Sequence, residues 1–426
     1  MKDEKQQLWI ILLIVFIGFI GTSIAYPIFP PLFLHPAAHT IVPLSWNENI
    51  RSIVLGLALA AYPFGQFIGS PILGSCSDHY SRKSILTISL LGGVLGYFLS
   101  AISLQFNWLW ILILSRFLTG MAEGNLAIVR AMATDLTSIN KYKSLGRINS
   151  VSSIGYIMGP LIGGFLSDDH LVSWFSYSLP FYLAAFFAFT AVILAALKLN
   201  ESTQVSSSAN ISILQRINLI ARFKLIFESN INLKYLLMIS TIFTFSVDIF
   251  YEFGAVYLTG LWSSTPAQIA IYNVALCITL ALGSGWLPHY LSRYFAISQV
   301  TITMMLITAA LLAAMALYLS PIFAFILFSL LGFSIAVATT NTTIQISNEA
   351  DKLIQGEAMG AQLSLRMLGD SIICVIGGFL IISSVILPIA CSGLVALIAA
   401  ALYRVKIMNR KGDLPKKNID FLGTGR

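Results

Sequence analysis

The feature that most constrains this chain is its succession of long apolar segments separated by short polar ones. A helix needs about 20 apolar residues to cross a membrane, and the chain offers about twelve such segments. Only 10% of its 426 residues are charged, against about 25% in a soluble protein. We therefore predict an all-α polytopic membrane protein with spans over 8–34, 50–74, 84–104, 108–134, 145–167, 177–197, 234–261, 266–288, 296–319, 321–347, 355–383 and 385–404.

One long polar interruption divides the predicted spans six and six. Its first part is rich in Ser, and its second part, ISILQRINLIARFKLIF, has the spacing of an amphipathic helix lying on a membrane surface. We expect an N-terminal six-helix half over 1–197, a cytoplasmic linker over 198–233, a C-terminal half over 234–404 and a cytoplasmic tail over 405–426.

The distribution of basic residues predicts the orientation. With the N-terminus in the cytoplasm, 21 of the 25 Lys and Arg residues fall in cytoplasmic segments, as the positive-inside rule requires. Both termini are then cytoplasmic, in a plasma membrane of the bacterial inner-membrane type. The net charge of +7 reflects these loops, so we expect a lipid bilayer and no nucleic acid as a partner.

The two predicted halves share sequence patterns. GSCSDHYSR at 74–82 matches GWLPHYLSR at 285–293 with an offset of 211, and GYIMGPLIGG at 155–164 matches GDSIICVIGG at 369–378 with an offset of 214. Two separate matches at nearly one offset indicate pseudo-symmetric copies. Paired six-helix halves around a midplane site are typical of alternating-access transporters.

Four motifs occur in order in the predicted spans. GSCSDHYSRKSIL has the pattern G-x-x-x-D-x-x-x-R-K/R, LILSRFLTGMAEG contains Arg116 and Gly120, and YPIFP contains a pair of prolines. GYIMGPLIGG contains Gly155, Gly159, Pro160, Gly163 and Gly164. Over essentially its whole length the sequence resembles the major facilitator superfamily, and within it the twelve-helix drug:proton antiporter group.

The resemblance implies roles for two of these motifs. In the loop after span two, Gly74, Asp78, Arg82 and Lys83 would form a gating motif. Asp78 would meet the start of span eleven, and Arg82 would join Asp78 to Asp135, holding the cytoplasmic side closed. The fifth-span motif would pack helices closely and is associated with antiport.

Two positions depart from the family pattern. Members of the antiporter group often carry an acidic residue in the first helix, where this chain has Gly18. In the fourth-helix motif a small residue is usual where Glu123 stands. These departures indicate that the ionisable groups have moved.

Charged residues inside the spans are the main candidates for function, because each costs about 2.5–3.5 kcal/mol at the bilayer centre. The family fold surrounds its cavity with spans one, four, seven and ten, flanked by two, five, eight and eleven. Arg130, near the end of span four, could instead extend its head group to the membrane surface. The candidates for proton coupling or substrate binding are Glu123, Asp248, Glu252, Arg116, Arg366 and Asp370.

Spacing suggests how these groups interact. Asp248 and Glu252 are four residues apart and share one helix face. Two such close carboxylates do not both ionise easily, which suits a proton carrier, although each could instead pair with an Arg on another helix. For Arg366 and Asp370 we expect either an intrahelical salt bridge or substrate contact.

Arg116 and Glu123 are seven residues apart and share a face of span four. Family resemblance links Arg116 to proton transfer, and Glu123 lies near mid-span. Further candidates for lining the cavity are Gln66, Asn125, Tyr251, Asn341, Gln345 and Gln362.

Cofactor and metal chemistry are not indicated. His35 and His39 lie four residues apart in a predicted outside loop, but no third ligand accompanies them, so a solvated loop is the better interpretation. We expect no cofactor and no metal site.

The sequence predicts a monomeric, proton-coupled secondary transporter of a small organic solute, and the fifth-span motif favours an exporter of a drug or metabolite. One alternative is a proton symporter that imports an amino acid, a carboxylate siderophore or a similar nutrient. Another is an uncoupled facilitator or a membrane receptor. The chain has no H-E-x-x-H or G-x-S-x-G motif, so we do not expect an enzyme.

Overall fold

The computed structural model describes residues 2–34, 41–43, 45–136, 141–201, 231–285, 287–291, 293–317, 320–349 and 355–408. Within these ranges the regular structure is helical throughout. The predicted surface helix of the linker, most of the tail, and His35 and His39 lie outside the described residues.

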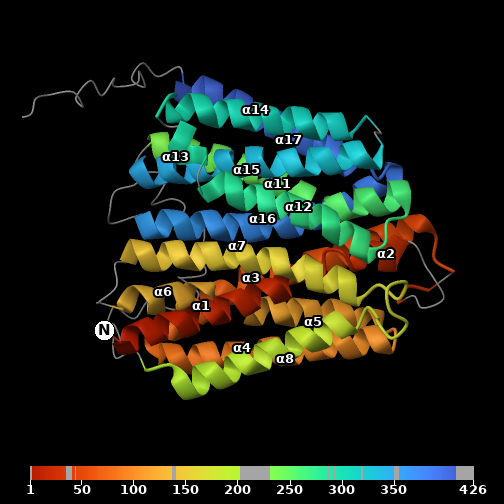
Figure 1. Ribbon diagram of the computed structural model, residues 1–426, viewed down its shortest axis with the longest axis vertical. Coiled ribbons are helices and arrows are strands. Elements are labelled where there is room, and N and C mark those ends of the chain that lie inside the picture. The colour runs from red at the N-terminus through yellow and green to blue at the C-terminus, as the bar shows by residue number, and fades with distance from the viewer. Residues whose placement is uncertain are drawn as a thin grey trace, which may run out of the picture.

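The helices form two groups that lie side by side with their axes roughly parallel (Figure 1). The first group comprises α1 (Lys2–Ser23), α2 (Phe29–Leu34), α3 (Glu48–His79), α4 (Arg82–Gln105), α5 (Leu109–Ala122), α6 (Leu126–Asp135), α7 (Lys141–Leu166) and α8 (Leu179–Lys198). The second comprises α11 (Ile231–Trp262), α12 (Pro266–Gly285), α13 (Leu287–Leu291), α14 (Ile297–Met315), α15 (Pro321–Glu349), α16 (Gln355–Ser383) and α17 (Leu387–Tyr403), followed by a π-helical turn at Arg404–Met408.

The predicted membrane-spanning segments are present as helices. In the described residues, eleven helical segments are long and apolar enough to cross a membrane, and α7 adds a shorter apolar segment, Ser150–Leu166. Two spans are broken: turns separate α1 from α2, and α5 from α6 at Glu123–Asn125. The predicted fold class is therefore confirmed, but spans one and four are each two helices where the sequence predicted one.

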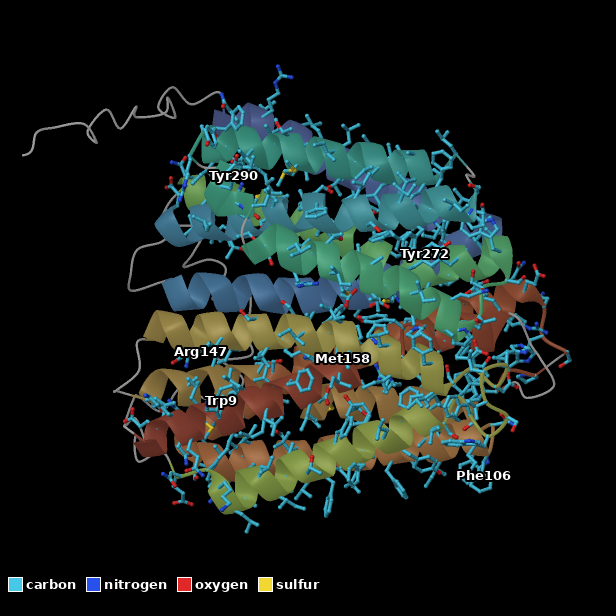
Figure 2. The ribbon with its side chains drawn as sticks, viewed as in Figure 1. Trp9, Phe106, Arg147, Met158, Tyr272 and Tyr290 are labelled. Carbon is cyan, nitrogen blue, oxygen red and sulfur yellow. The ribbon has the colours of Figure 1, made fainter. Side chains whose placement is uncertain are left out.

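Large apolar side chains cover the outside of the bundle (Figure 2). Trp9 is 72% exposed and Ile322 is 74% exposed. Trp9 and Phe106 lie toward opposite ends of the helices. Such a surface is stable against lipid tails, since apolar side chains lose little by facing an apolar solvent.

We call the end of the bundle where α1 begins the terminal side, and the end where α3 begins the far side. At the far side, glycines bring the two groups into backbone contact. A Cβ on Gly56 of α3 would lie 2.9 Å from the Cα of Gly378 on α16, and a Cβ on Gly164 of α7 would lie 2.4 Å from the carbonyl oxygen of Pro266 on α12. Small residues allow helices to approach this closely.

An apolar cluster completes the closure of the far side. Phe253 and Val256 of α11, with Cys374 and Ile381 of α16, are buried in one cluster with side chains of the first group, Phe29 among them. The side chains of this cluster are hydrophobic, so apolar burial contributes to the closure.

Glycines also join helices within the first group. On α3, Gly65 and Gly69 face α5. Gly120 of α5 and Gly124, in the turn that follows it, have the same four-residue spacing and lie against α3. A Cβ on Gly120 would lie 2.0 Å from the carbonyl oxygen of Tyr62. The two backbones are therefore in contact, which fixes the position of Glu123 beside α3.

The fifth-span motif presents two different faces. Gly155, Gly159 and Gly163 lie against α1, and a Cβ on Gly159 would meet the Ser23 hydroxyl oxygen at 2.0 Å. Gly164 faces α12 of the other group. Pro160 lies within α7 and lines the central cavity. One short motif thus packs α7 on its own group and on the opposite one.

Candidate functional site in the central cavity

A cavity lies between the two groups of helices. It has two lobes of about 270 and about 420 Å³. Both lobes share six lining residues: Phe19, Tyr26, Arg130, Tyr156, Tyr251 and Arg366. The first lobe reaches from Phe29 toward the terminal side, and the second continues to Ser240 and Thr343. With the far side closed, the cavity extends from the middle of the bundle toward the terminal side.

All six charged residues predicted as candidates line the first lobe. Arg116 and Glu123 come from the broken span four, Asp248 and Glu252 from α11, and Arg366 and Asp370 from α16. Arg130, for which we considered a position at the membrane surface, also lines both lobes.

Glu123 is held by hydroxyl groups. The Tyr97 hydroxyl donates to its Oε1 at 2.5 Å, the Tyr62 hydroxyl donates to its Oε2, and the Thr22 hydroxyl lies 3.4 Å from Oε2. Among the described residues, no ion pair to Glu123 is formed. The carboxyl group is therefore stabilised by hydrogen bonds that are compatible with either protonation state.

These hydroxyls continue to the backbone of α1. The Tyr62 and Thr22 hydroxyl oxygens are 2.8 Å apart, and Thr22 donates to the carbonyl oxygen of Gly18 at 3.0 Å. A Cβ at Gly18 would meet nothing within 4 Å. Thr22 thus links Glu123 to Gly18, the α1 position that the sequence singled out as lacking an acidic residue.

Arg116 is buried against aromatic rings. Its guanidinium carbon lies 4.6 Å from the ring centre of Tyr62 and 5.9 Å from that of Phe29. The residue is 4% exposed, and its Nε and one terminal nitrogen have no hydrogen-bond partner. Cation–π contact compensates only part of the lost hydration of such a group.

Asp248 forms an ion pair with Arg366. Arg366 donates to it from Nε at 3.1 and 3.2 Å and from a terminal nitrogen at 2.7 Å. The Asp248 side chain is 3% exposed, whereas that of Arg366 is 40% exposed. Of the two alternatives for Arg366 and Asp370, the intrahelical salt bridge is not formed, because Asp248 offers Arg366 a two-oxygen acceptor across the helix interface.

Asp370 and Glu252 form the rest of the acidic wall. The Oδ1 atom of Asp370 is buried without a hydrogen-bond partner. Glu252, Asp370 and Cys374 place one ligand atom each within 4.8 Å of one another, and the Tyr26 hydroxyl faces the Glu252 carboxylate. This set has the spacing to hold a small cation, and it also concentrates negative charge that protons can neutralise.

Comparison with known proteins assigns the family. The family model described as Major Facilitator Superfamily matches residues 11–374. The chain belongs to the Major Facilitator Superfamily.

Relatives and solved structures agree with this assignment. The chain is 28% identical over 392 residues to Multidrug resistance protein 1 of Bacillus subtilis (strain 168), covering 89% of this chain and 91% of the relative. It is 34% identical over 199 residues to the class H tetracycline resistance protein of Pasteurella multocida. That match covers 46% of this chain and 45% of the relative, which is less than half of either. The solved structure of the xylose transporter XylE from E. coli has a TM-score of 0.72 at 14% identity, covering 97% of this chain and 100% of that chain.

The superfamily comprises transporters of small molecules, so this chain is an integral membrane transporter and not an enzyme.

Only some of the other residues predicted to line the cavity do so. Gln66, Asn125 and Tyr251 line the cavity. Asn341 is buried and is not among the lining residues. Gln345 bonds Thr301 at 3.0 Å and Tyr403 at 2.6 Å, so its amide joins helices instead. The Gln362 side chain lies outside the described residues.

The superfamily's gating motif is partly described. Arg82 of α4 forms an ion pair with Asp135 at the end of α6. Both residues belong to the first group of helices, so this pair alone does not join the halves. A Cβ on Gly74 would meet nothing within 4 Å, so among the described contacts Gly74 does not bring two helices together. The Asp78 side chain lies outside the described residues, and Lys83 is partly buried.

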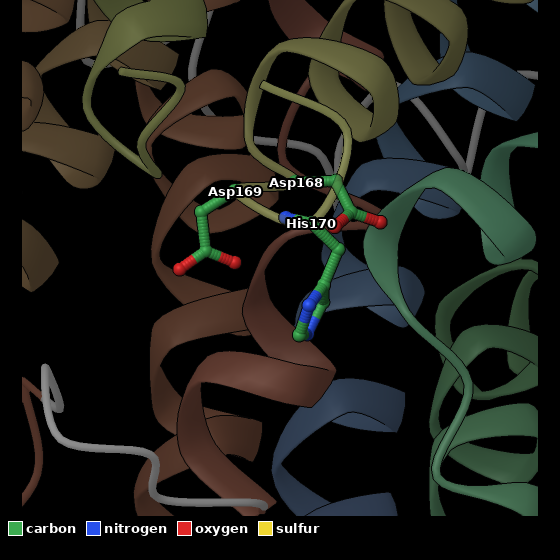
Figure 3. A group of neighbouring side chains, drawn as sticks. All are labelled: Asp168, Asp169 and His170. Atoms are coloured by element: carbon green, nitrogen blue, oxygen red, sulfur yellow. Dashed lines mark hydrogen bonds between the residues drawn. The ribbon is translucent and has the colours of Figure 1, made fainter. Parts of the chain in front are cut away.

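A second acidic group lies outside the transporter's cavity. Asp168, Asp169 and His170, in the loop after α7, place ligand atoms within 4.8 Å of one another (Figure 3). Their charge acts on a neighbouring tyrosine. Burial, together with the negative charges of Asp169 and Asp168, raises the pKa of the Tyr177 hydroxyl to about 12. None of these three side chains lines the cavity, so we give them no part in transport.

Sequence reasoning missed the hydroxyl groups that hold Glu123. Thr22, Tyr62 and Tyr97 come from three helices, and an isolated Tyr or Thr in a span has no distinguishing pattern. A signal was present in the paired glycines of α3 and α5, because two four-residue glycine spacings predict a close crossing beside Glu123.

Proposed function

We propose that this protein is a proton-coupled exporter of small organic molecules that works by alternating access. The observation that carries the proposal is Glu123, a cavity carboxyl group held by hydroxyls and free of ion pairs among the described residues. Such a group can take up a proton without leaving a charged partner unpaired. Asp248 cannot, because its protonation would leave Arg366 uncompensated.

The hydroxyl chain supports both forms of Glu123. When the carboxyl group is ionised, Tyr62 and Tyr97 donate to it. When it is protonated, it donates to the Tyr62 oxygen, Tyr62 donates to Thr22, and Thr22 donates to the Gly18 carbonyl. Every polar atom keeps a partner in each state, so the exchange leaves no buried group unsatisfied.

The direction of export is supported by charge and by relatives. The positive-inside distribution places the terminal side, and both termini, in the cytoplasm, so the cavity would collect its substrate there. Relatives include proteins named for multidrug and tetracycline resistance. Proton entry from outside would then accompany the switch that opens the far side. We expect the protein to act as a monomer in a bacterial plasma membrane.

The test uses purified protein in liposomes with an imposed pH gradient. Tetracycline, norfloxacin and ethidium serve as probes, and internal pH is followed by a trapped dye. Substrate movement against the direction of proton flow supports export. Movement with the proton flow would instead establish the importing symporter. Transport whose pH dependence is unchanged in Glu123→Gln, Asp248→Asn and Glu252→Gln would establish an uncoupled facilitator.

A further inference from the structure

Two side chains of the cavity keep polar atoms that nothing satisfies. Of the described lining residues, Arg116 and Asp370 have buried nitrogen or oxygen atoms without a hydrogen-bond partner. One side chain is a cation and the other is an anion. A buried polar atom without a partner loses its hydration with no compensating bond, and the loss is larger when the group is charged, so a ligand that satisfies both side chains gains from each.

Arg116 has the geometry of a built anion subsite. The Tyr62 and Phe29 rings fix its guanidinium, and the residue is 4% exposed. No ion pair joins it to Glu123 or Glu252 among the described residues, although its charge acts on both carboxylates. Because Arg116 lines the first lobe, a ligand acceptor that enters the cavity can supply the missing hydrogen bonds.

Asp370 provides the corresponding subsite for a cation. Arg366, four residues earlier on α16, is committed to Asp248 through three hydrogen bonds. Glu252 adds a second carboxylate within 4.8 Å of Asp370. A positively charged ligand nitrogen here would meet two carboxylates and no competing cation at hydrogen-bond distance within the described residues.

Aromatic rings line the same lobe as the two subsites. The ring centres of Tyr26 and Tyr156 are 5.8 Å apart, and those of Tyr156 and Tyr251 are 6.3 Å apart. These three residues line the first lobe together with Arg116 and Asp370. With lobes of about 270 and about 420 Å³, the cavity suits a drug-sized ring system.

We propose that the transported substrates are aromatic zwitterions, whose anionic group binds Arg116 and whose basic nitrogen binds Asp370. This inference rests on the proposed function only in taking the central cavity as the transport site. It concerns which molecules bind, independently of the coupling ion and of the direction of transport.

The first test varies the charge of the ligand. Norfloxacin carries a carboxylate and a basic piperazine nitrogen. Its ethyl ester lacks the anion, its N-acetyl derivative lacks the cation, and the N-acetyl ethyl ester lacks both. Equilibrium dialysis against purified protein in detergent at pH 7, without a gradient, gives the four dissociation constants. We expect norfloxacin to bind at least about ten-fold more tightly than each singly neutralised compound.

The second test varies the charge of the protein. Arg116→Gln should abolish the preference for norfloxacin over its ester and keep the preference over the N-acetyl derivative. Asp370→Asn should show the reverse. Arg130→Gln, which removes another cavity arginine, should keep both preferences. Equal loss in Arg130→Gln and Arg116→Gln would overturn the assignment of the anion subsite.

The outcomes separate this inference from the proposed function. Wild-type binding constants of the four compounds within about two-fold of each other, or no binding of any, would overturn the zwitterion assignment even if a variant failed to fold. Binding with the expected preference but no proton-linked transport would leave the inference intact and refute the proposed coupling.

Discussion

Glu123 and Asp248 face one cavity from opposite groups of helices, yet their partners differ in kind. Glu123 accepts hydrogen bonds from tyrosines, whereas Asp248 is bound by the Arg366 guanidinium. Hydroxyls can reverse their donor direction and an arginine cannot. The comparison shows that position in a cavity does not by itself make a carboxylate a proton carrier, because the partner decides whether protonation is tolerated.

The largest effect is expected from Glu123→Gln. The amide keeps the shape of the side chain and cannot bind or release a proton. Proton-driven transport in liposomes should fall at least about 100-fold, while norfloxacin binding by dialysis changes less than about three-fold. A variant that retains gradient-driven accumulation would remove Glu123 from the coupling mechanism.

A transfer of the carboxyl group controls for this result. Gly18 has free space beside the same hydroxyl chain. Gly18→Glu in the Glu123→Gln background should restore a measurable part of the proton-driven transport. Gly18→Glu in the wild type should not raise proton-driven transport. This control distinguishes replacement of Glu123 from a general increase in the transport rate.

Asp248→Asn should act on stability. It leaves Arg366 without its anion, and because that arginine is 40% exposed to the cavity, we expect a loss of about 2 kcal/mol, at the low end for a broken pair. The midpoint of unfolding in a denaturing-detergent titration measures it. Arg366→Gln added to Asp248→Asn should recover at least half of the loss, and a further decrease would contradict the bracing role.

Tyr62→Phe should separate proton transfer from simple hydrogen bonding. Tyr62 links Glu123 to Thr22, whereas the Tyr97 hydroxyl bonds Glu123 only. We expect about a ten-fold slower proton-driven transport in Tyr62→Phe and a loss of a few-fold in Tyr97→Phe. Equal losses in the two variants would argue against a relay through Thr22.

The smallest effects come from a matched pair of glycines on α1. A Cβ on Gly21 would lie 2.1 Å from the Tyr97 hydroxyl oxygen, whereas one on Gly18 meets nothing within 4 Å. Gly21→Ala should displace Tyr97 and reproduce the few-fold loss of Tyr97→Phe. Gly18→Ala should leave the transport rate within about two-fold of wild type.

The span count and the six charged cavity residues could be predicted from sequence, because uninterrupted apolar runs and costly buried charges leave few alternatives. The choice of partners could not. Arg366 has Asp370 four residues away on its own helix but pairs with Asp248 of α11, and only the distance between helices decides this. The sequence likewise predicts Gln345 as a polar lining residue, but in the structure its amide accepts a hydrogen bond from Tyr403.

The break in span four was also hidden in the sequence. Glu123 and Asn125 flank Gly124, whose missing side chain lets the turn rest on the backbone of Gly69 and Ser70. Helix propensity alone would place only a weak point at a single glycine. The tertiary contact with α3 determines where the helix stops.

The contact between Gly56 and Gly378 affects how fast the protein can change state. At this crossing the two backbones touch, so neither glycine has a side chain that must change rotamer before the helices part. Opening of the far side is then resisted by the neighbouring apolar side chains, which makes their size a means of setting the turnover rate without altering the binding site.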